Sequence, residues 1–312
     1  MPALARDIPF YALLIESCSS GKELITLRKI HARILTVGIA HHDFLRAKLV
    51  SSYASCSCMR EAAHVFSRTN RQSTFLYNSM IKGYASLGLH SQSLVVFTHM
   101  IRCGKLLDRH TLPSVLKACA GLSSLRLGRQ VHVAVLVRGF APDVAACNSL
   151  VAMYGRSGDL ASARRVFDQM PERNAVSWSA IIGAYGQHGL SGEAVRLFDE
   201  MMVAGESPDE VAFTAVLSAC SHGRLMEEGW RVWGMMMEGR FGVRRRLEHY
   251  TCMVDMLGRA GHVEEAEALI GGMEGEPDEA LWNALLGACR LHGKVEVAER
   301  VAERVYGGKI GF

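Results

Sequence analysis

The sequence lacks the features that mark most metal proteins, redox enzymes and membrane proteins. Its nine cysteines form no CxxC pair, which excludes a zinc ribbon and a thioredoxin-like motif. No apolar run approaches the roughly 18 residues of a membrane-spanning helix, so we expect no membrane partner. We likewise expect no cofactor, no bound metal ion and no small-molecule substrate.

A strong charge of either sign is also missing. The net charge is +4, from 35 lysines and arginines against 31 aspartates and glutamates. A protein that coats nucleic acid nonspecifically would usually be more basic. The charge balance therefore permits a polyanionic partner but does not require one.

Apolar residues are abundant and make up 49% of the 312 residues. A chain of this length exceeds what most single hydrophobic cores serve, whereas a repeat array extends one core lengthwise. Several cysteines fall at equivalent places in apolar stretches, as in SCSS, ACAG and ACSH. We therefore expect the cysteines to be small buried hydrophobes in a reduced compartment.

One sequence pattern recurs in segments that begin at residues 74, 144, 175, 247 and 279. Such self-similarity is typical of a repeat architecture. In each segment a small polar residue stands fifth and a glycine stands fifteenth. The fifth residues are Asn78, Asn148, Ser179, Thr251 and Asn283. The fifteenth residues are Gly88, Gly158, Gly189, Gly261 and Gly293.

Each segment is expected to fold as two helices. Apolar residues at helical spacing, as in YNSMIKGYASLG, predict an amphipathic first helix. The glycine ends this helix, because a helix terminus often needs a left-handed residue. A second amphipathic helix follows, as in LSGEAVRLFDEM. We therefore predict an all-α fold, a right-handed α-solenoid of about nine helix-turn-helix repeats.

The alternation of unit lengths resembles the plant pentatricopeptide repeat family, specifically its subclass of mixed P-, L- and S-type motifs. STFLYNSMIKGYASLGLHSQSLVVFTHM is similar to a P motif, and NSLVAMYGRSGDLASARRVFDQMPERN is similar to an S motif. TLPSVLKACAGLSSLRLGRQVHVAVLVRGFAPD is similar to an L motif. The resemblance implies L-type units at 8–42, 109–143 and 210–246, S-type units at 43–73 (weak), 144–174 and 247–278 (terminal), P-type units at 74–108 and 175–209, and a partial E-type extension at 279–312.

Members of this subclass that carry their own cytidine deaminase end in a domain with an HxE motif and a later CxxC. His262-Val263-Glu264 has the HxE spelling, but it lies at the start of a second helix and no CxxC follows. A zinc deaminase needs three protein ligands besides that glutamate. We therefore expect that this chain is not an enzyme and has no catalytic residues.

The resemblance implies that each unit binds one base of single-stranded RNA through two or three side chains, a known property of this family. The fifth residue of a unit lies in its first helix, and the last residue lies at the neighbouring loop, so both can reach one base edge. The second residue would pack against the base face. The expected RNA-binding residues are Asn78 with Asp108, Asn148 with Asn174, Ser179 with Asp209, and Thr251 with Asp278, together with Phe75 and Val176.

The pairing rule of the family predicts a base for each of these units. Unit 74–108 should prefer U, unit 144–174 a pyrimidine, and units 175–209 and 247–278 G. The L-type units have residues such as Ala12 and Pro113 in the fifth place and are expected to act as spacers or as weak readers. A polar residue in a first helix could simply be solvated, but solvation requires no common register, whereas a ladder of RNA contacts does.

We therefore expect recognition of an organellar transcript for C-to-U editing, with a deaminase-bearing or other editing-complex protein acting in trans. The alternatives are an RNA splicing or stability factor, a protein-binding helical scaffold and an inactive fragment. A tetratricopeptide scaffold is disfavoured because its W-x2-L-G-x2-Y signature and its constant length of about 34 residues are absent. The start, MPALARDIPFYALL, is too short for a convincing transit peptide. The expected location is a mitochondrion or chloroplast, with the mitochondrion preferred.

Overall fold

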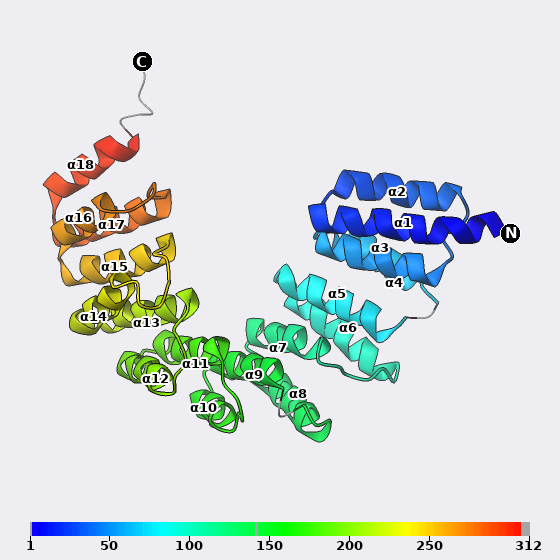
Figure 1. Cartoon of the computed structure of the whole chain (residues 1–312), viewed down its shortest axis with the longest axis horizontal. Helices are drawn as coiled ribbons and strands as arrows, with labels where there is room; N and C mark the ends of the chain where they lie inside the picture. Colours follow the sequence, from blue (N-terminus) through cyan, green and yellow to red (C-terminus); the bar gives the residue numbers. More distant parts are fainter. Residues whose placement is uncertain (1, 71, 141–142, 307–312) are drawn as a thin grey trace, which may run out of the picture. The chain divides into compact units, whose positions relative to one another are not determined.

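The computed structural model describes residues 2–70, 72–140 and 143–306. These residues form eighteen α-helices, and the described part of the chain contains no strand. The helices follow one another in pairs joined by short turns (Figure 1). The expected all-α class is therefore confirmed, and the helix pairs are compatible with about nine repeats.

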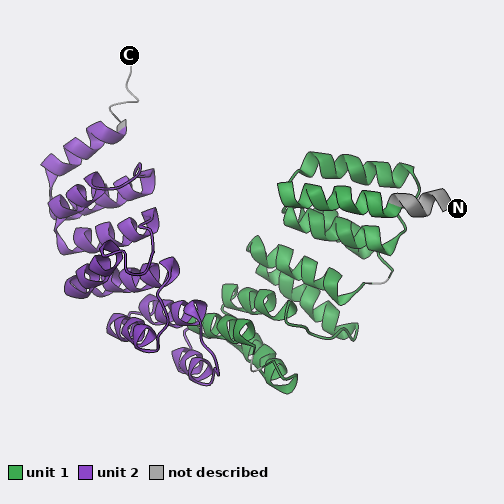
Figure 2. Cartoon of the chain, in the orientation of Figure 1, with its two compact units in different colours: residues 1–157 green, residues 158–312 purple. Residues whose placement is uncertain are grey.

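The chain divides into two compact units, Met1–Ser157 and Gly158–Phe312 (Figure 2). Unit 1 contains the first nine helices, and α1 begins before residue 8, where the first repeat was expected to start. The helices of unit 1 are α1 (Pro2–Gly21), α2 (Leu24–Thr36), α3 (Asp43–Ser55), α4 (Met59–Ser67), α5 (Thr74–Ser86), α6 (His90–Arg102), α7 (Thr111–Gly121), α8 (Leu125–Val137) and α9 (Val144–Arg156).

Helix packing in unit 1 follows a repeating scheme. The odd-numbered helices are the first helices of the pairs, and they contact one another in the order α1, α3, α5, α7 and α9. Each even-numbered helix contacts the odd-numbered helix before it and the one after it. The first helices therefore form one continuous row, and every pair buries its apolar faces against its neighbours.

Unit 2 follows the same scheme, with α11, α13, α15 and α17 in contact in that order. These helices approach closely where a glycine faces an alanine: a Cβ added at Gly258 of α15 would lie 2.7 Å from Ala288 Cβ of α17. Residues 307–312 of the expected extension lie outside the described residues. The helices of unit 2 are α10 (Leu160–Asp168), α11 (Ala175–Gln187), α12 (Ser191–Val203), α13 (Glu210–Gly223), α14 (Met226–Met237), α15 (Leu247–Ala260), α16 (Val263–Gly271), α17 (Glu279–His292) and α18 (Val295–Tyr306).

The turn within each pair contains a left-handed residue, as the glycine pattern predicted. The five glycines in the fifteenth place have φ between +66° and +86°. The other four units place a non-glycine residue there, also with positive φ. These residues are Lys22, Ser57, Ser123 and Arg224. The turn geometry is therefore common to all the units, although an L-amino acid adopts it at a cost of roughly 1–2 kcal/mol.

The cysteines occupy the core in most of the units. The burial predicted for the cysteines is found at Cys18, Cys119, Cys147, Cys220 and Cys289. Burial raises the pKa of Cys119 to about 11, so its thiol stays protonated at neutral pH. The prediction was wrong for Cys103, which is exposed because it directly follows the end of α6.

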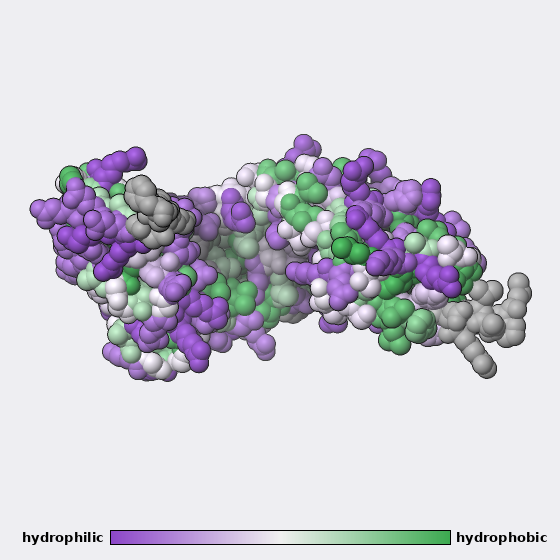
Figure 3. Space-filling model, turned by 90° about the horizontal axis from the view of Figure 1, so that it is seen from above, coloured by the Kyte–Doolittle hydropathy of each residue, from purple (hydrophilic) through white to green (hydrophobic). Residues whose placement is uncertain are grey.

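Hydrophobic side chains on the molecular surface are interspersed with hydrophilic ones (Figure 3). Phe10, Leu13 and Ile25 of the first helix pair are among the exposed apolar residues. Among the described residues, no helix combines the length and apolar character needed to cross a membrane.

Candidate nucleic-acid interface

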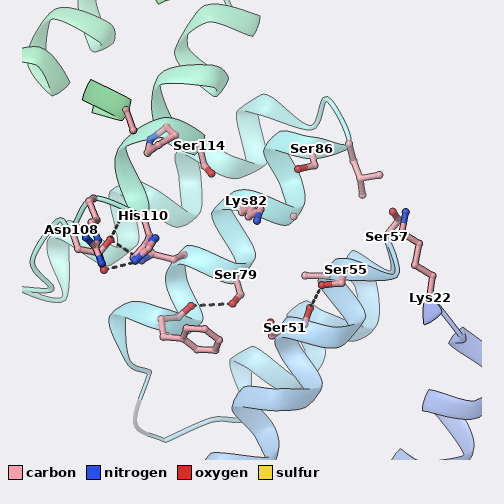
Figure 4. Close-up of a pocket in the computed structure, with 18 of the residues that line it drawn as sticks. Lys22, Ser51, Ser55, Ser57, Ser79, Lys82, Ser86, Asp108, His110 and Ser114 are labelled. Carbon is pink, nitrogen blue, oxygen red and sulfur yellow. Dashed lines mark hydrogen bonds between the residues drawn. The ribbon is translucent and has the colours of Figure 1, made fainter. Parts of the chain in front are cut away.

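The first helices of unit 1 line a groove of about 1050 Å³. α3, α5 and α7 supply most of its wall, and the left-handed turn after α1 supplies Lys22 (Figure 4). Many of the lining residues carry short hydroxyl groups, which suit hydrogen bonding to a polar ligand. These residues are Ser51, Ser55, Ser57, Ser79, Ser86 and Ser114.

Two of the predicted residues, Asn78 and Asp108, meet in this groove. Asn78 lies on α5, and Asp108 lies in the segment that leads into α7. Asn78 Nδ2 donates a hydrogen bond to the Asp108 carboxylate, with both Oδ1 and Oδ2 at 3.0 Å. Both side chains are half-buried. The packing of α5 against α7 therefore joins the fifth and last residues of unit 74–108.

Asp108 has a second role as a cap of the turn at residues 109–110, which leads into α7. Its Oδ1 accepts hydrogen bonds from the backbone N–H groups of His110 and Thr111, both at 2.9 Å. Burial by itself would raise the pKa of Asp108, but hydrogen bonds from Thr111, Asn78 and the His110 backbone hold that pKa below its ordinary value. Asp108 is therefore ionised at neutral pH and acts only as an acceptor.

Asn148 and Asn174 belong to one repeat, 144–174, but Asn148 lies in compact unit 1 and Asn174 in compact unit 2. Asn148 is half-buried on α9 of unit 1. In unit 2, Asn174 caps α11, because its Oδ1 accepts from the Ser177 backbone N–H at 3.1 Å. The Ser177 hydroxyl accepts from the Asn174 N–H at 3.2 Å, which completes a reciprocal capping box. The pairing of Asn148 with Asn174 at one base remains a prediction.

Ser179 and Asp209 lie close together in unit 2. The Ser179 hydroxyl is 2.7 Å from the Ala175 carbonyl oxygen and 3.5 Å from Asp209 Oδ1, so its stronger bond is to its own helix. Asp209 caps α13 by accepting from the Ala212 N–H at 2.8 Å. Ser179 is only 8% exposed, so it is less accessible than the half-buried Asn78.

Thr251 and Asp278 are both described, but no hydrogen bond joins their side chains. Thr251 Oγ1 donates to the Leu247 carbonyl oxygen at 2.8 Å, within α15. Asp278 caps α17 by accepting from the Leu281 N–H at 2.8 Å. In unit 247–278 the fifth and last residues therefore each satisfy the backbone of a separate helix.

The residues in the second place of their units stand at the surface. Phe75 is 55% exposed and Val176 is 57% exposed, each in the first turn of its helix. Phe75 also lines the groove that holds Asn78. An exposed apolar side chain beside a hydrogen-bonding pair can cover the face of a flat ring while the pair contacts its edge.

Basic residues also line the groove that holds the Asn78–Asp108 pair, and sequence reasoning missed them. Lys82 follows Asn78 by one helical turn and is exposed in the groove with Lys22 and Arg109. Lys82 could have been found from its i+4 spacing to Asn78, which places both on one helix face. Lysine and arginine side chains at a groove attract phosphate groups.

The residues of the HxE spelling contact different partners in unit 2. His262 Nδ1 lies 2.8 Å from Glu265 Oε1, and Lys294 Nζ donates to Glu264 Oε1 at 2.8 Å. Across the residues that the structure describes, no cluster of three or more His, Cys, Asp or Glu side chains is arranged to hold a metal ion.

Known solved structures share this arrangement of helices. The pentatricopeptide repeat protein PPR10 in complex with an 18-nucleotide psaJ RNA element matches 92% of this chain and 43% of its own, with a TM-score of 0.75 and 14% sequence identity. At that identity the similarity shows the fold alone. Another structure of PPR10 from maize matches 90% of this chain and 46% of its own, with a TM-score of 0.53 and 17% sequence identity.

Sequence comparisons agree with the fold. The chloroplastic pentatricopeptide repeat-containing protein CRR2 of Arabidopsis thaliana is 38% identical over 302 residues, which are 95% of this chain and 46% of the relative. A mitochondrial pentatricopeptide repeat-containing protein of the same plant is 33% identical over 296 residues, 95% of this chain and 42% of its own. The chain thus spans less than half the length of these relatives.

The repeats themselves match models of known repeat families. Residues 173–222 match the PPR repeat family model, and residues 134–188 match the pentatricopeptide repeat domain model. The PPR repeat model matches residues 75–104, 211–241 and 248–277. Together these segments cover more than half of the chain. Because its helix pairs, its relatives and its repeat models all agree, the chain belongs to the pentatricopeptide repeat family.

Proposed function

We propose that this protein binds single-stranded RNA in a sequence-specific manner, with one base at each unit that carries a polar pair. The observation that carries the proposal is the Asn78–Asp108 pair, in which both carboxylate oxygens lie 3.0 Å from Asn78 Nδ2 in an open groove. The pair presents hydrogen-bonding groups to a base edge. The structure of PPR10 with an RNA element supports the same class of ligand.

The surroundings of the pair suit the other parts of a nucleotide. Phe75 is exposed beside Asn78 and can cover the face of the base. Lys22 and Lys82 stand at the same groove and can contact phosphates. A base edge, a base face and a phosphate therefore each have a matching group within one groove of unit 1.

The base preferences follow the pairing rule of the family. Unit 74–108 prefers U, unit 109–143 accepts any base, unit 144–174 prefers a pyrimidine, and unit 175–209 prefers G. The preference for G is the weaker one, because the Ser179 hydroxyl bonds mainly to Ala175 and is 3.5 Å from Asp209. The expected core is thus U, any base, pyrimidine, G.

The finer role that we propose is site recognition for C-to-U editing in an organelle, with the deaminase supplied in trans. The alternation of L-, S- and P-type units supports this role through the resemblance to the mixed subclass. Relatives of the chain carry both chloroplastic and mitochondrial names, which supports an organellar location. The residues of the HxE spelling are engaged with Glu265 and Lys294, which favours a separate catalytic protein.

Selection of bound sequences from a random single-stranded RNA pool tests the proposed function. The expected result is enrichment of U, any base, pyrimidine and G in consecutive register. The matched variant Asn78→Ala should flatten the first position and leave the others enriched. A selection that enriches no sequence would overturn the proposal. The same holds if peptides, but not RNA, displace a bound ligand, because that result would indicate a protein scaffold.

A further inference from the structure

We propose that Thr111 is a positioning residue that sets the base preference of unit 74–108 by fixing the orientation of the Asn78 amide. This inference rests on the proposed RNA-binding function and deepens it. Thr111 belongs to the next unit, where it begins α7 in the third place. It adds a third residue to the pair formed by Asn78 and Asp108.

The three side chains form a closed hydrogen-bond network. Thr111 Oγ1 lies 2.7 Å from Asn78 Oδ1 and 3.0 Å from Asp108 Oδ1. The Asp108 backbone N–H lies 3.3 Å from the same hydroxyl oxygen and donates to it. On its other side, Asn78 donates through Nδ2 to the Asp108 carboxylate. Both ends of the Asn78 amide are therefore held by protein groups.

The network can be satisfied in only one orientation of the amide. The Asp108 carboxylate accepts hydrogen bonds and cannot donate, so Asn78 must turn Nδ2 towards it. The Thr111 hydroxyl donates to Asn78 Oδ1 while accepting from the Asp108 N–H. The second hydrogen on Nδ2 and the second lone pair on Oδ1 then point in fixed directions. A base edge meets one donor and one acceptor in a set order, which is the information needed to choose a base.

Thr111 acts through Asn78 and does not touch the ligand. Its exposed fraction is 0%, and the residues that line the groove are its neighbours Arg109, His110 and Pro113. Removing its hydroxyl leaves Asn78 Oδ1 without this partner, so the amide is held only through Nδ2 and can tilt about its last side-chain bond. The result is a loss of selectivity and not a loss of a direct contact with RNA.

Units 175–209 and 247–278 lack this hydroxyl. The third residues after Asp209 and Asp278 are Ala212 and Leu281, which offer only a backbone N–H. In those two units the fifth residues, Ser179 and Thr251, donate instead to carbonyl oxygens of their own helices. Unit 74–108 should therefore discriminate between bases more sharply than unit 175–209.

The test uses the full chain and four single-stranded RNAs with the core X-A-C-G, where X is U, C, A or G in identical flanks. The variants are Thr111→Val, which removes the hydroxyl at nearly constant shape, and Thr111→Ser, which keeps it. Thr98→Val is the matched control, because its hydroxyl donates at 2.8 Å to Leu94 within α6. Thermal unfolding of each variant establishes that it is folded.

Thr111→Val should lower the preference for U over A by about fivefold, the factor that about 1 kcal/mol represents at 25 °C. Affinity for the A-containing RNA should change little, whereas a merely structural role would weaken all four RNAs equally. Thr111→Ser and Thr98→Val should keep the wild-type preference. The decisive case is one in which Asn78→Ala abolishes the preference for U. The inference is then overturned if Thr111→Val leaves that preference intact, or if it weakens the binding of all four RNAs alike. If Asn78→Ala also has no effect, the proposed function itself fails at this unit.

Discussion

Asp108 accepts a hydrogen bond from Asn78 Nδ2 at 3.0 Å through each of its carboxylate oxygens, and the same carboxylate caps the turn that leads into α7. The residue proposed to contact RNA is thus also a structural residue of the next repeat. Asn174, Asp209 and Asp278 cap the helices that follow them. A mutation at the last place of a unit therefore acts on stability and on any RNA contact together, unless the new residue can still cap.

Replacing Asp108 by Asn separates these two effects. Asparagine retains an oxygen that can cap this turn, so the free energy of unfolding should change by less than about 0.5 kcal/mol. The unit then carries an Asn–Asn pair, and its preference should relax from U to U or C. Asp108→Ala should also cost about 1 kcal/mol of stability, because the cap is lost. Binding to RNAs that differ at this base and denaturant unfolding measure the two effects. A retained preference for U in Asp108→Asn would argue against the pairing rule.

Replacing Asn78 by Thr, with Asp108 retained, should shift the preferred base from U to G. The physical reason is that the amide, with its adjacent donor and acceptor, is exchanged for a single hydroxyl. Competition between RNAs that differ only at this base measures the shift. Thr98→Val is a matched control outside the groove, since the Thr98 hydroxyl donates to the Leu94 carbonyl oxygen at 2.8 Å within α6. No change in base preference for Asn78→Thr would remove Asn78 from the proposed site.

Lys82→Ala should weaken RNA binding by a similar factor for every sequence. A lysine that contacts phosphate contributes affinity without base discrimination, because phosphates are the same at each nucleotide. The slope of log affinity against log salt concentration should become shallower by about 0.7 for single-stranded RNA. Lys29→Ala provides the control, since Lys29 is exposed on the second helix α2. An unchanged salt slope in Lys82→Ala would show that Lys82 does not contact the backbone.

Ser123→Gly should raise the stability of the protein. Ser123 has φ +50°, where an L-residue is strained, and glycine is not. The strain energy that is relieved in the folded state exceeds the entropic cost of ordering a glycine on folding. The free energy of unfolding should therefore rise by about 0.5–1 kcal/mol.

Gly189→Ala is the reverse experiment. Gly189 has φ +77°, and a Cβ added there would have no neighbouring atom within 4 Å. Gly189→Ala should therefore lower the free energy of unfolding by about 1 kcal/mol through backbone strain alone. Denaturant unfolding measures both changes, and a less stable Ser123→Gly protein would contradict this account.

Acidification should destabilise unit 1 through His132. His132 Nδ1 lies 2.9 Å from Tyr154 Oη, and burial lowers the pKa of His132 below 6.5. As the pH falls below 6.5, the unfolded chain takes up a proton that the folded chain does not yet bind. The free energy of unfolding should therefore decrease between pH 7.5 and pH 5.5. His132→Gln should show a smaller decrease, whereas His41→Gln, at an exposed position, should behave as the wild type. Equal pH dependence in all three proteins would exclude His132 as the source.

Much of the fold could be predicted from the sequence because its causes are local. Apolar spacing specified the helix pairs, and Gly88 or Gly189 marked the turn where the chain must become left-handed. The same turn at Lys22 or Arg224 could not be predicted, because no residue preference favours it there. The packing of the neighbouring helices imposes that geometry on a residue that would avoid it in isolation.

In the candidate site, too, some features could be predicted from the sequence and others could not. The repeat register placed Asn78, Asp108 and Phe75 in equivalent positions of a unit, and the resemblance to the family predicted that they act together; the hydrogen bond between Asn78 and Asp108 and the exposure of Phe75 agree with that prediction. Only the tertiary structure decided that Thr111 completes the network and that Ser179 is buried to 8% exposure. Those outcomes depend on the side chains that adjacent helices bring within hydrogen-bond distance, and a period counted along one chain carries no information about that distance.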